Sequence, residues 1–181
     1  MEKHIIAFGA SNSKHSINKT LATYAGNQLE GINLEVLDLN DYPLPVYSID
    51  DQRATGIPEE AVAFLLKIKE SDGIIISLAE YNGLYTSAFK NLWDWLSRVE
   101  SPAIWQNKPM LLLSASPARR DSNYVTKVSL ELFPAFGANI IADFCLPSFN
   151  HFFKGGEIVE ADYAQKFQIA LQKFQAFLNS N

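Results

Sequence analysis

The sequence predicts a doubly wound α/β domain built on a five-stranded parallel sheet of strand order 2-1-3-4-5. Apolar strand-like segments alternate with amphipathic helical segments along the whole chain, which favours a parallel sheet covered by helices on both faces. Residues 73–79 are almost continuously apolar, as in a strand buried on both faces. The 181 residues contain no repeat or linker, so we expect one domain spanning residues 1–181.

The N-terminal half supplies two strands, two helices and a loop. Residues 4–11 are the first expected strand, and a helix follows. Residues 34–40 alternate in polarity and predict the second strand, whereas residues 41–56 contain two prolines and several turn formers and predict a loop. Residues 57–71 predict a helix, with a proline near its start and two glutamates in its first turn. The two helices have these apolar faces: Ile17, Leu21, Tyr24, Ala25 and Leu29; Ala61, Phe64, Leu65 and Ile68.

The C-terminal half continues the alternation. Residues 73–79 predict the third strand, and an aromatic-rich helix ends near Arg98. Residues 108–116 and 138–147 predict the fourth and fifth strands, with a helix at 124–133 between them. A final helix completes the domain and has this apolar face: Phe167, Ala170, Leu171, Phe174 and Leu178.

Composition excludes several classes of partner. The formal net charge of −5 and the pI near 5.2 argue against nucleic acid or an anionic membrane surface as the main partner. No apolar stretch approaches the roughly 20 residues of a membrane span. The single cysteine, Cys145, permits no internal disulfide and is interpreted as a core residue, and no signal peptide is evident, so we expect a cytoplasmic protein. The three histidines are scattered, so no metal site is expected.

Two polar loops follow neighbouring strands of the predicted sheet. Ligands of open parallel sheets bind beyond the carboxyl ends of the strands, where the winding direction reverses. In this strand order that point lies between strands one and three. The loops that follow these strands, residues 9–18 and 79–85, are the most polar turns of the chain, which predicts a ligand site between them.

The first loop has the chemistry of a phosphate site. Ser11, Ser13 and Ser16 supply hydroxyls at the start of a helix, Asn18 supplies an amide, and Lys14 and its neighbour His15 add positive potential. The alternative is that Ser16 only caps the helix. Neither GxxxxGK[ST] nor GxGxxG is present, so a single phosphomonoester such as that of FMN fits better than a pyrophosphate.

The second loop has residues suited to a flat heterocycle. Gly83 allows close approach of the backbone to a ligand, Tyr81 offers a ring for packing, and Asn82 both donates and accepts hydrogen bonds. The start of the following helix would stabilise negative charge on a flavin that accepts hydride. In that helix an unusually wide apolar arc includes Trp93 and Trp95, from which we infer a helix-mediated homodimer. The alternative is burial of both tryptophans within one subunit.

These residues resemble two motifs of the NAD(P)H-dependent FMN reductase family, which includes quinone, chromate and azo-dye reductases of flavodoxin-like fold. Residues 10–18 resemble the family motif G-S-x-R-x-x-S-x-N. A second motif, P-E-Y-N-G followed by K-N-x-x-D-W-x-S-R, is matched at residues 80–83 and 90–98. The resemblance implies FMN binding by these residues: Ser11, Ser13, Ser16, Ile17, Asn18, Glu80, Tyr81, Asn82, Gly83, Ser116 and Arg120.

The resemblance also implies an activity. NADH or NADPH would give hydride to FMN, which would reduce a small-molecule acceptor such as free flavin or a quinone. No side chain would be a catalytic nucleophile, because the cofactor does the chemistry. Family members form dimers or tetramers, so the resemblance implies a homodimer or homotetramer.

Three departures from the family pattern leave alternatives open. Ser13 replaces an arginine, Ala79 replaces a proline, and residues 117–122 lack the glycines of the family's S-P-G-G-R-G-G segment. In that segment, Arg119 and Arg120 would bind a nucleotide phosphate or form a solvated surface pair. The alternatives are a flavodoxin-like electron carrier and a relative that has lost flavin affinity and acts as a binding protein.

Overall fold

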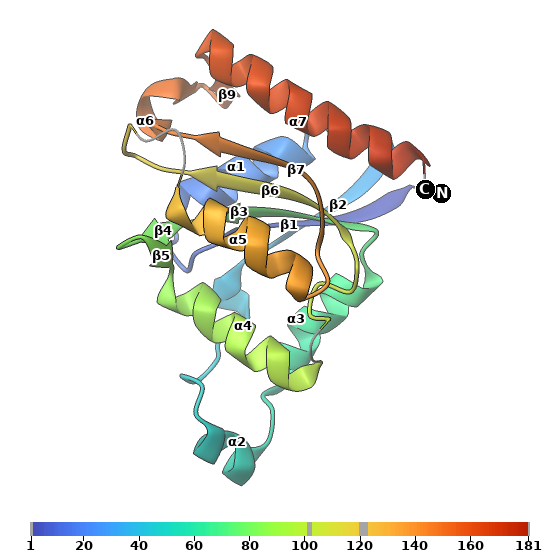
Figure 1. The fold of residues 1–181 in the computed structure, drawn as a ribbon, viewed down its shortest axis with the longest axis vertical. Coiled ribbons are helices and arrows are strands. Elements are labelled where there is room, and N and C mark those ends of the chain that lie inside the picture. The colour runs from blue at the N-terminus through green and yellow to red at the C-terminus, as the bar shows by residue number, and fades with distance from the viewer. Residues whose placement is uncertain (1, 101–102, 120–122, 181) are drawn as a thin grey trace.

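The computed structural model describes residues 2–100, 103–119 and 123–180. Its main sheet is parallel and has the order β2-β1-β3-β6-β7, which confirms the predicted order 2-1-3-4-5 for the five principal strands (Figure 1). These strands are β1 (Lys3–Ala10), β2 (Ile32–Leu37), β3 (Gly73–Leu78), β6 (Pro109–Ala115) and β7 (Asn139–Leu146).

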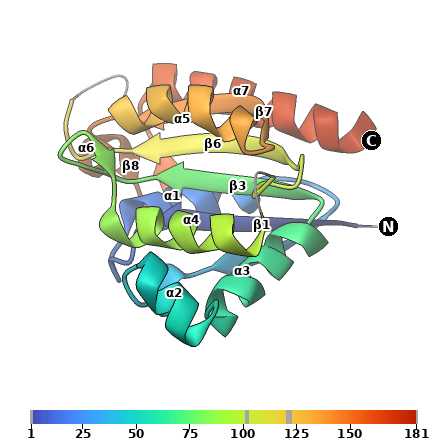
Figure 2. The same cartoon turned by 60° about the horizontal axis from the view of Figure 1, so that its bottom comes forward.

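Helices cover both faces of this sheet (Figure 2). One face carries α1 (Ile17–Gly26) and α7 (Ala161–Ser180), and the other carries α3 (Glu59–Glu70), α4 (Ser87–Val99) and α5 (Tyr124–Ala135). Successive residues of β1 alternate between the two layers, because side chains of a strand point to opposite faces. Ile5 and Ala7 pack with α1 and α7, whereas Ile6 and Phe8 pack with the other three helices.

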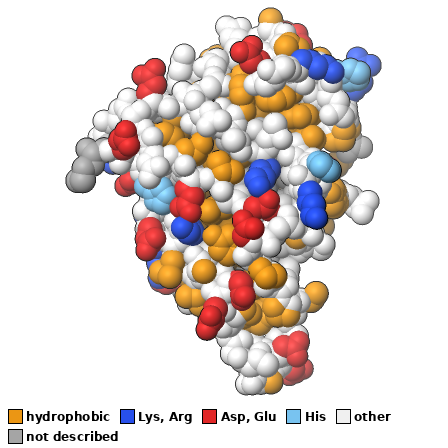
Figure 3. Space-filling view, turned by 180° about the vertical axis from the view of Figure 1, so that it is seen from behind, with side chains coloured by type: hydrophobic (Ala, Val, Ile, Leu, Met, Phe, Trp, Pro, Cys, Tyr) orange, Lys and Arg blue, Asp and Glu red, His pale blue; other side chains and the backbone are white. Residues whose placement is uncertain are grey.

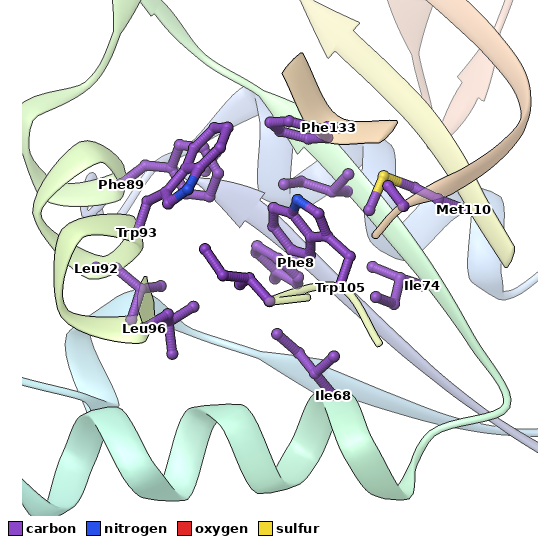
Figure 4. Close-up of a cluster of buried hydrophobic side chains, with 14 of the residues drawn as sticks. Phe8, Ile68, Ile74, Phe89, Leu92, Trp93, Leu96, Trp105, Met110 and Phe133 are labelled. Atoms are coloured by element: carbon purple, nitrogen blue, oxygen red, sulfur yellow. The ribbon is translucent and has the colours of Figure 1, made fainter. Parts of the chain in front are cut away.

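The core under α3, α4 and α5 is rich in aromatic side chains (Figure 4). Trp93 packs edge-to-face on Trp105 and on Phe133, with ring centroids 6.1 and 5.0 Å apart. Such offset geometries are the favoured contacts between aromatic rings. This layer fixes α4 and α5 against β1 and β3, and therefore fixes the two helix starts that lie at the carboxyl edge of the sheet.

Several short elements differ from the sequence prediction. The second strand begins two residues before the predicted range 34–40 and ends three residues before its end. It ends early because Leu39–Asp41 form a 3₁₀ helix (η1), which the Asp38 carboxylate caps. Prediction of a loop over residues 41–56 was wrong for α2 (Ile49–Thr55), which Ser48 caps. Having no buried residue, α2 offers no apolar stripe in the sequence. Five further elements were not predicted: β4 (Glu80–Tyr81), β5 (Leu84–Tyr85), α6 (Phe149–Phe152), and the two strands of a second hairpin, β8 (Phe153–Lys154) and β9 (Glu157–Ile158).

The wide apolar arc of α4 is covered within one chain. Trp95 is 0% exposed, and Trp93 is also buried. The segment before α2 supplies the cover: Trp95 Nε1 donates to the Pro45 carbonyl at 2.8 Å, and the Tyr47 ring packs edge-to-face on the indole. The inference that these tryptophans need a second subunit was therefore wrong, and burial within one subunit is what the structure has.

Two further expectations concern features of the whole chain. Over the residues that the structure describes, no helix is both long and apolar enough to cross a membrane. Within the same residues, no group of histidine, cysteine and acidic side chains could hold a metal ion. Cys145 lies in β7 and is partly buried.

Candidate functional site

The predicted site lies where the carboxyl ends of β1, β3 and β6 meet. A cavity of about 200 Å³ lies at this edge and is bounded by residues 11–18, 79–81 and 115–117. Eight of the predicted residues line it: Ser11, Ser13, Ser16, Ile17, Asn18, Glu80, Tyr81 and Ser116. Asn82 and Gly83 lie at the adjoining turn and do not line the cavity, and Arg120 lies outside the described residues.

The serines of the first loop fold the loop itself. The Ser13 N–H donates to Ser11 Oγ at 3.1 Å, and the His15 N–H donates to Ser13 Oγ at 3.3 Å. The Ser16 N–H donates to the Ser13 carbonyl at 3.2 Å. These bonds wrap the backbone around the start of α1, a local pattern for which serine is well suited.

The start of α1 presents two backbone donors to the cavity. Ser16 caps the helix, since its Oγ accepts from the Lys19 N–H at 3.1 Å. The N–H groups of Ile17 and Asn18 have no acceptor within the part of the chain that the structure describes, and both residues line the cavity. Capping and anion binding are thus compatible here: the serine satisfies one donor, and two donors remain at the positive end of the helix.

Gly9, near the end of β1, lets α1 approach the sheet closely. A Cβ atom at this position would lie 2.4 Å from the Lys19 nitrogen and 2.8 Å from its Cα. Only glycine allows this approach, which positions the first turn of α1 over the end of β1. Sequence reasoning did not identify Gly9, although a glycine between a strand and a serine-rich helix start is the available signal.

Asn18 joins three elements beneath the cavity. Its side chain is buried, and Oδ1 accepts from the Ala115 N–H at 2.7 Å and from Ser77 Oγ at 2.8 Å. Its Nδ2 donates to the Ala115 carbonyl at 3.2 Å. The amide therefore ties α1 to the ends of β3 and β6, and one Nδ2 hydrogen remains beyond these bonds.

The second loop is a tight hairpin. Glu80 pairs with Tyr85, and Tyr81 pairs with Leu84, around a turn in which Asn82 has φ 54° and Gly83 has φ 84°. Two successive residues with positive φ are typical of the Asn-Gly turn of a two-residue hairpin. Gly83 is thus required by its backbone conformation, a reason different from the close ligand approach inferred from the sequence.

Both strands of this hairpin bind α5. The Glu80 carboxylate accepts from the Val125 N–H at 3.2 Å, and Tyr85 Oη lies 2.7 Å from Ser129 Oγ. Asn123 is the N-cap residue of α5, but its side chain makes no capping hydrogen bond. The Glu80 carboxylate therefore takes the place of a local cap. Burial raises the pKa of the Tyr85 phenol above its usual value, although the Ser129 hydrogen bond opposes this, so the phenol is neutral at physiological pH.

Thr86 links the hairpin to the first strand. Its hydroxyl donates to the Ala10 carbonyl at 2.9 Å and accepts from the Phe89 N–H at 3.2 Å. It thereby caps α4 and holds the helix start against the end of β1. Sequence reasoning did not single out Thr86, although a threonine three residues before the first buried helical residue is a capping signal.

The loop after β6 forms the third wall. Ser116 donates its N–H to the Leu146 carbonyl and accepts from the Phe149 N–H at its own carbonyl, so both backbone groups are used. Its Oγ accepts from the Ala118 N–H at 3.1 Å. This turn lacks the glycines of the family pattern and is held by hydrogen bonds to the β7–α6 connection instead.

Comparisons with known proteins agree with this geometry. The sequence matches the NADPH-dependent FMN reductase family over residues 4–151. It is 33% identical over 104 residues to a 2-hydroxy-1,4-benzoquinone reductase from a Burkholderia species. The matched region covers 57% of this chain and 55% of that protein. It is 34% identical over 84 residues to an NADPH:quinone oxidoreductase from Arabidopsis thaliana, which is 46% of this chain and 41% of that protein. The matches thus span about half the length of these relatives.

Solved structures share the whole fold. FerB, a flavoenzyme NAD(P)H:(acceptor) oxidoreductase from Paracoccus denitrificans, has a TM-score of 0.78 at 22% identity, with 98% of each chain covered. The apo form of the NADH:FMN oxidoreductase EMOB has a TM-score of 0.72 at 19% identity, covering 99% of this chain and 91% of that one. At such identities the likeness shows a shared flavodoxin-like fold. Because the family match covers most of the chain, the chain belongs to the NADPH-dependent FMN reductase family.

Proposed function

We propose that this chain is an NAD(P)H-dependent flavin oxidoreductase that uses FMN to pass hydride from a nicotinamide to a small acceptor. The observation that carries the proposal is the pair of unsatisfied N–H groups of Ile17 and Asn18, which line a cavity beside three serines. A phosphate dianion fits such donors at the positive end of a helix. The family match supports the same cofactor.

The residues present fit one end of FMN. The cavity is smaller than the roughly 300–1,000 Å³ typical of sites that enclose a whole small molecule, so it suits the phosphate end. The isoalloxazine would then be held by the hairpin, whose Tyr81 side chain is 57% exposed at the rim. As expected from the sequence, Asn82 and Gly83 are proposed as ring contacts, and Arg120 stays a proposed cofactor-binding residue.

FMN, when bound, supplies the hydride-accepting and hydride-donating centre, and the protein supplies binding and electrostatics. Ser11, Ser13 and Ser16 orient the phosphate end. The hairpin is held by Thr86 on one side and by α5 on the other, so it offers the ring a fixed platform. A platform that is already in place does not have to reorganise during the reaction. Such preorganisation of polar groups is the usual source of electrostatic stabilisation in enzymes.

The acceptor is proposed to be a quinone or a related small electrophile. Two relatives are named as reductases of quinones, one of them of 2-hydroxy-1,4-benzoquinone. The exposed Tyr81 and Leu84 side chains at the hairpin provide apolar surface against which a planar acceptor could pack. Free flavin is the other acceptor that the family suggests.

A cytoplasmic location is kept as a proposal from the sequence. A homodimer is also proposed, on the basis of an exposed apolar surface and not of the buried tryptophans. Val46 and Ile49, in the segment that carries α2, are 83% and 51% exposed, and a cavity of about 340 Å³ lies between this segment and α4. Exposed apolar side chains beside a hollow are typical of a protein contact surface. Sedimentation velocity of V46D, with V46N as the uncharged control, tests whether charge here shifts the protein toward monomer.

The decisive experiment for the activity is spectroscopic and kinetic. The purified protein is titrated with FMN while visible absorbance and flavin fluorescence are recorded, and NADH and NADPH oxidation is then followed with a benzoquinone. Saturable FMN binding with turnover supports the proposal. FMN binding with negligible turnover would identify a flavodoxin-like electron carrier, and no uptake of FMN would leave the binding-protein alternative.

A further inference from the structure

His15 is the one basic side chain among the described residues that line the cavity at the end of the sheet. The ionisable side chains of this lining are His15, Glu80 and Tyr81. Lys14 and Lys19 line a groove on the outer side of α1 and do not line the cavity. Acidic and basic side chains are interspersed on the face of the molecule shown in Figure 3, so surface charge in general does not mark an anion site there. The lining of the cavity is therefore the better guide.

The backbone of His15 is held in place, whereas its ring is free. The His15 N–H donates to Ser13 Oγ at 3.3 Å, and the Ser16 N–H donates to the Ser13 carbonyl at 3.2 Å. His15 comes directly before Ser16, the N-cap of α1, and lines the cavity together with Ile17 and Asn18, whose N–H groups are unsatisfied. The side chain is exposed, and within the part of the chain that the structure describes no hydrogen bond or ion pair engages the imidazole. The ring is therefore available to a ligand at the start of α1.

No described carboxylate around the imidazole is left to compete with an anionic ligand. Glu80 lines the same cavity, but its carboxylate accepts a hydrogen bond from the start of α5. On the side of the outer groove the ionisable neighbours are Lys14, Lys19 and Tyr24, and no aspartate or glutamate is among the described residues that line this groove. The Lys19 ammonium is paired with Asp38, so that pair is already satisfied. The surroundings thus favour a bound anion over an internal partner for the imidazole.

We propose that His15, in its protonated form, binds the phosphate of FMN and takes the place of the arginine that the family motif has where this chain has Ser13. The inference rests on the proposed function, because it needs that phosphate at the start of α1. An imidazolium donates a charge-assisted hydrogen bond to a phosphate oxygen, and such bonds are about twice as strong as those between neutral groups. Arginine keeps its charge at every physiological pH, whereas histidine gains and loses its charge between about pH 5 and 8. The exchange of arginine for histidine therefore makes FMN binding sensitive to pH.

Binding of FMN is then coupled to binding of a proton. A histidine side chain is partly neutral near neutral pH, and a phosphate dianion beside it favours the protonated ring. The imidazole takes up a proton from solution as FMN binds and returns it when FMN leaves. Riboflavin has the same ring but no phosphate, so its binding needs no such proton. Because a phosphate monoester itself titrates near pH 6, the effect of His15 is read from the difference between the wild type and a variant at the same pH.

Three variants test this role of His15. His15→Gln removes the charge, His15→Arg supplies a charge that does not titrate, and Lys14→Gln removes a neighbouring charge that does not line the cavity. The apoproteins are titrated with FMN and with riboflavin by flavin fluorescence at constant ionic strength. We expect the wild type to bind FMN about tenfold more tightly than H15Q at about pH 5.5 and less than about twofold more tightly at about pH 8.5. H15R should keep the tenfold advantage at both pH values, and K14Q should weaken FMN by one small factor at every pH, because lysine stays protonated.

Riboflavin affinity should be the same in all four proteins at every pH. Calorimetry of FMN binding near pH 7, in two buffers of different ionisation enthalpy, counts the protons, and the wild type should take up more of them than H15Q. A ratio of wild-type to H15Q affinity that does not change with pH, with equal proton uptake, would overturn the role of His15 and leave the proposed function intact. Equal weakening of riboflavin and FMN in H15Q would also overturn it, since the residue would then act on the fold of the loop. Failure of FMN to bind any of the proteins would overturn both proposals. Circular dichroism of the apoproteins checks that the variants fold.

Discussion

Glu80 and Tyr85 face each other across the β4–β5 hairpin, and both bind α5 one helical turn apart. Glu80 accepts from the Val125 N–H, and the Tyr85 hydroxyl contacts Ser129, four residues further along the same helix. Residues four apart lie on one face of a helix, so the two bonds hold the hairpin at two points. The hairpin that borders the site is therefore positioned by α5.

Removing either of these two hydrogen bonds to α5 should loosen the hairpin. Glu80→Ala leaves the Val125 N–H without its acceptor, and Tyr85→Phe deletes one hydroxyl, so each should cost about 1 kcal/mol of unfolding free energy. FMN affinity should fall further in the double variant, because the hairpin is then held only at Thr86. Glu131→Gln, at an exposed position of α5 that does not line the cavity, is the control.

Urea titration measures the loss of unfolding free energy in these variants. Amide hydrogen exchange of residues 124–129 measures how firmly the hairpin and α5 are held together. Faster exchange at Val125 in Glu80→Ala, with unchanged exchange in α7, is the expected pattern. Uniform exchange across α5 in every variant would contradict the role given to Glu80.

Asn18 should matter more for stability than for phosphate contact. Asn18→Ala removes three hydrogen bonds and leaves the Ala115 N–H and carbonyl and the Ser77 hydroxyl buried without a partner, which should cost about 2–4 kcal/mol. Ser16→Ala removes a helix cap and should cost about 1 kcal/mol. Urea denaturation of the apoproteins measures both losses, and equal losses would show that the Asn18 bridge contributes no more to stability than the Ser16 cap.

Trp95 should hold the segment before α2 rather than a second subunit. Trp95→Phe keeps an aromatic ring and loses the donor to the Pro45 carbonyl, which the Asn91 side chain also binds. We expect faster limited proteolysis within residues 42–56 and an unchanged sedimentation coefficient. Trp105→Phe is the matched control, because the Trp105 indole nitrogen makes no hydrogen bond to this segment. A shift toward monomer in Trp95→Phe would restore the interface interpretation.

Asp38 should make stability depend on acid pH. Although partial burial acts to raise it, hydrogen bonds from Lys19 and Asn40 hold the pKa of the Asp38 carboxyl below its ordinary value of 3.8. A depressed folded-state pKa stabilises the fold above the unfolded-state pKa, and this contribution is lost as pH falls through the folded-state value.

Asp38→Asn retains an oxygen that can accept from the Asn40 N–H and removes the charge. The wild type should exceed this variant in unfolding free energy at pH 6, and the difference should shrink as pH falls below about 3.8. Guanidinium chloride would screen the ion pair, so urea is the suitable denaturant. A difference that stayed constant down to pH 2 would argue against a role for the charge.

The fold could be predicted from the sequence because its signals are local. Continuous apolar runs mark buried parallel strands, and alternation of strands with amphipathic helices leaves few arrangements. The position of the site followed from the strand order, since the loops after the first and third strands must meet at one edge. The structure places Ser16, Ile17 and Glu80 around one cavity there.

What only the tertiary structure decided is which polar groups remain available to a ligand. Asn18 and Glu80 carry the chemistry of ligands in the sequence, but each is engaged by backbone groups far along the chain, at Ala115 and Val125. The indole of Trp95 is likewise covered by a segment about 50 residues earlier. Hydrogen bonds and burial between distant residues depend on three-dimensional packing, and a pattern of neighbouring residues carries no record of them. The chain alone therefore determined the architecture and predicted the edge of the sheet at which the cavity lies, and packing determined how the side chains around that cavity are used.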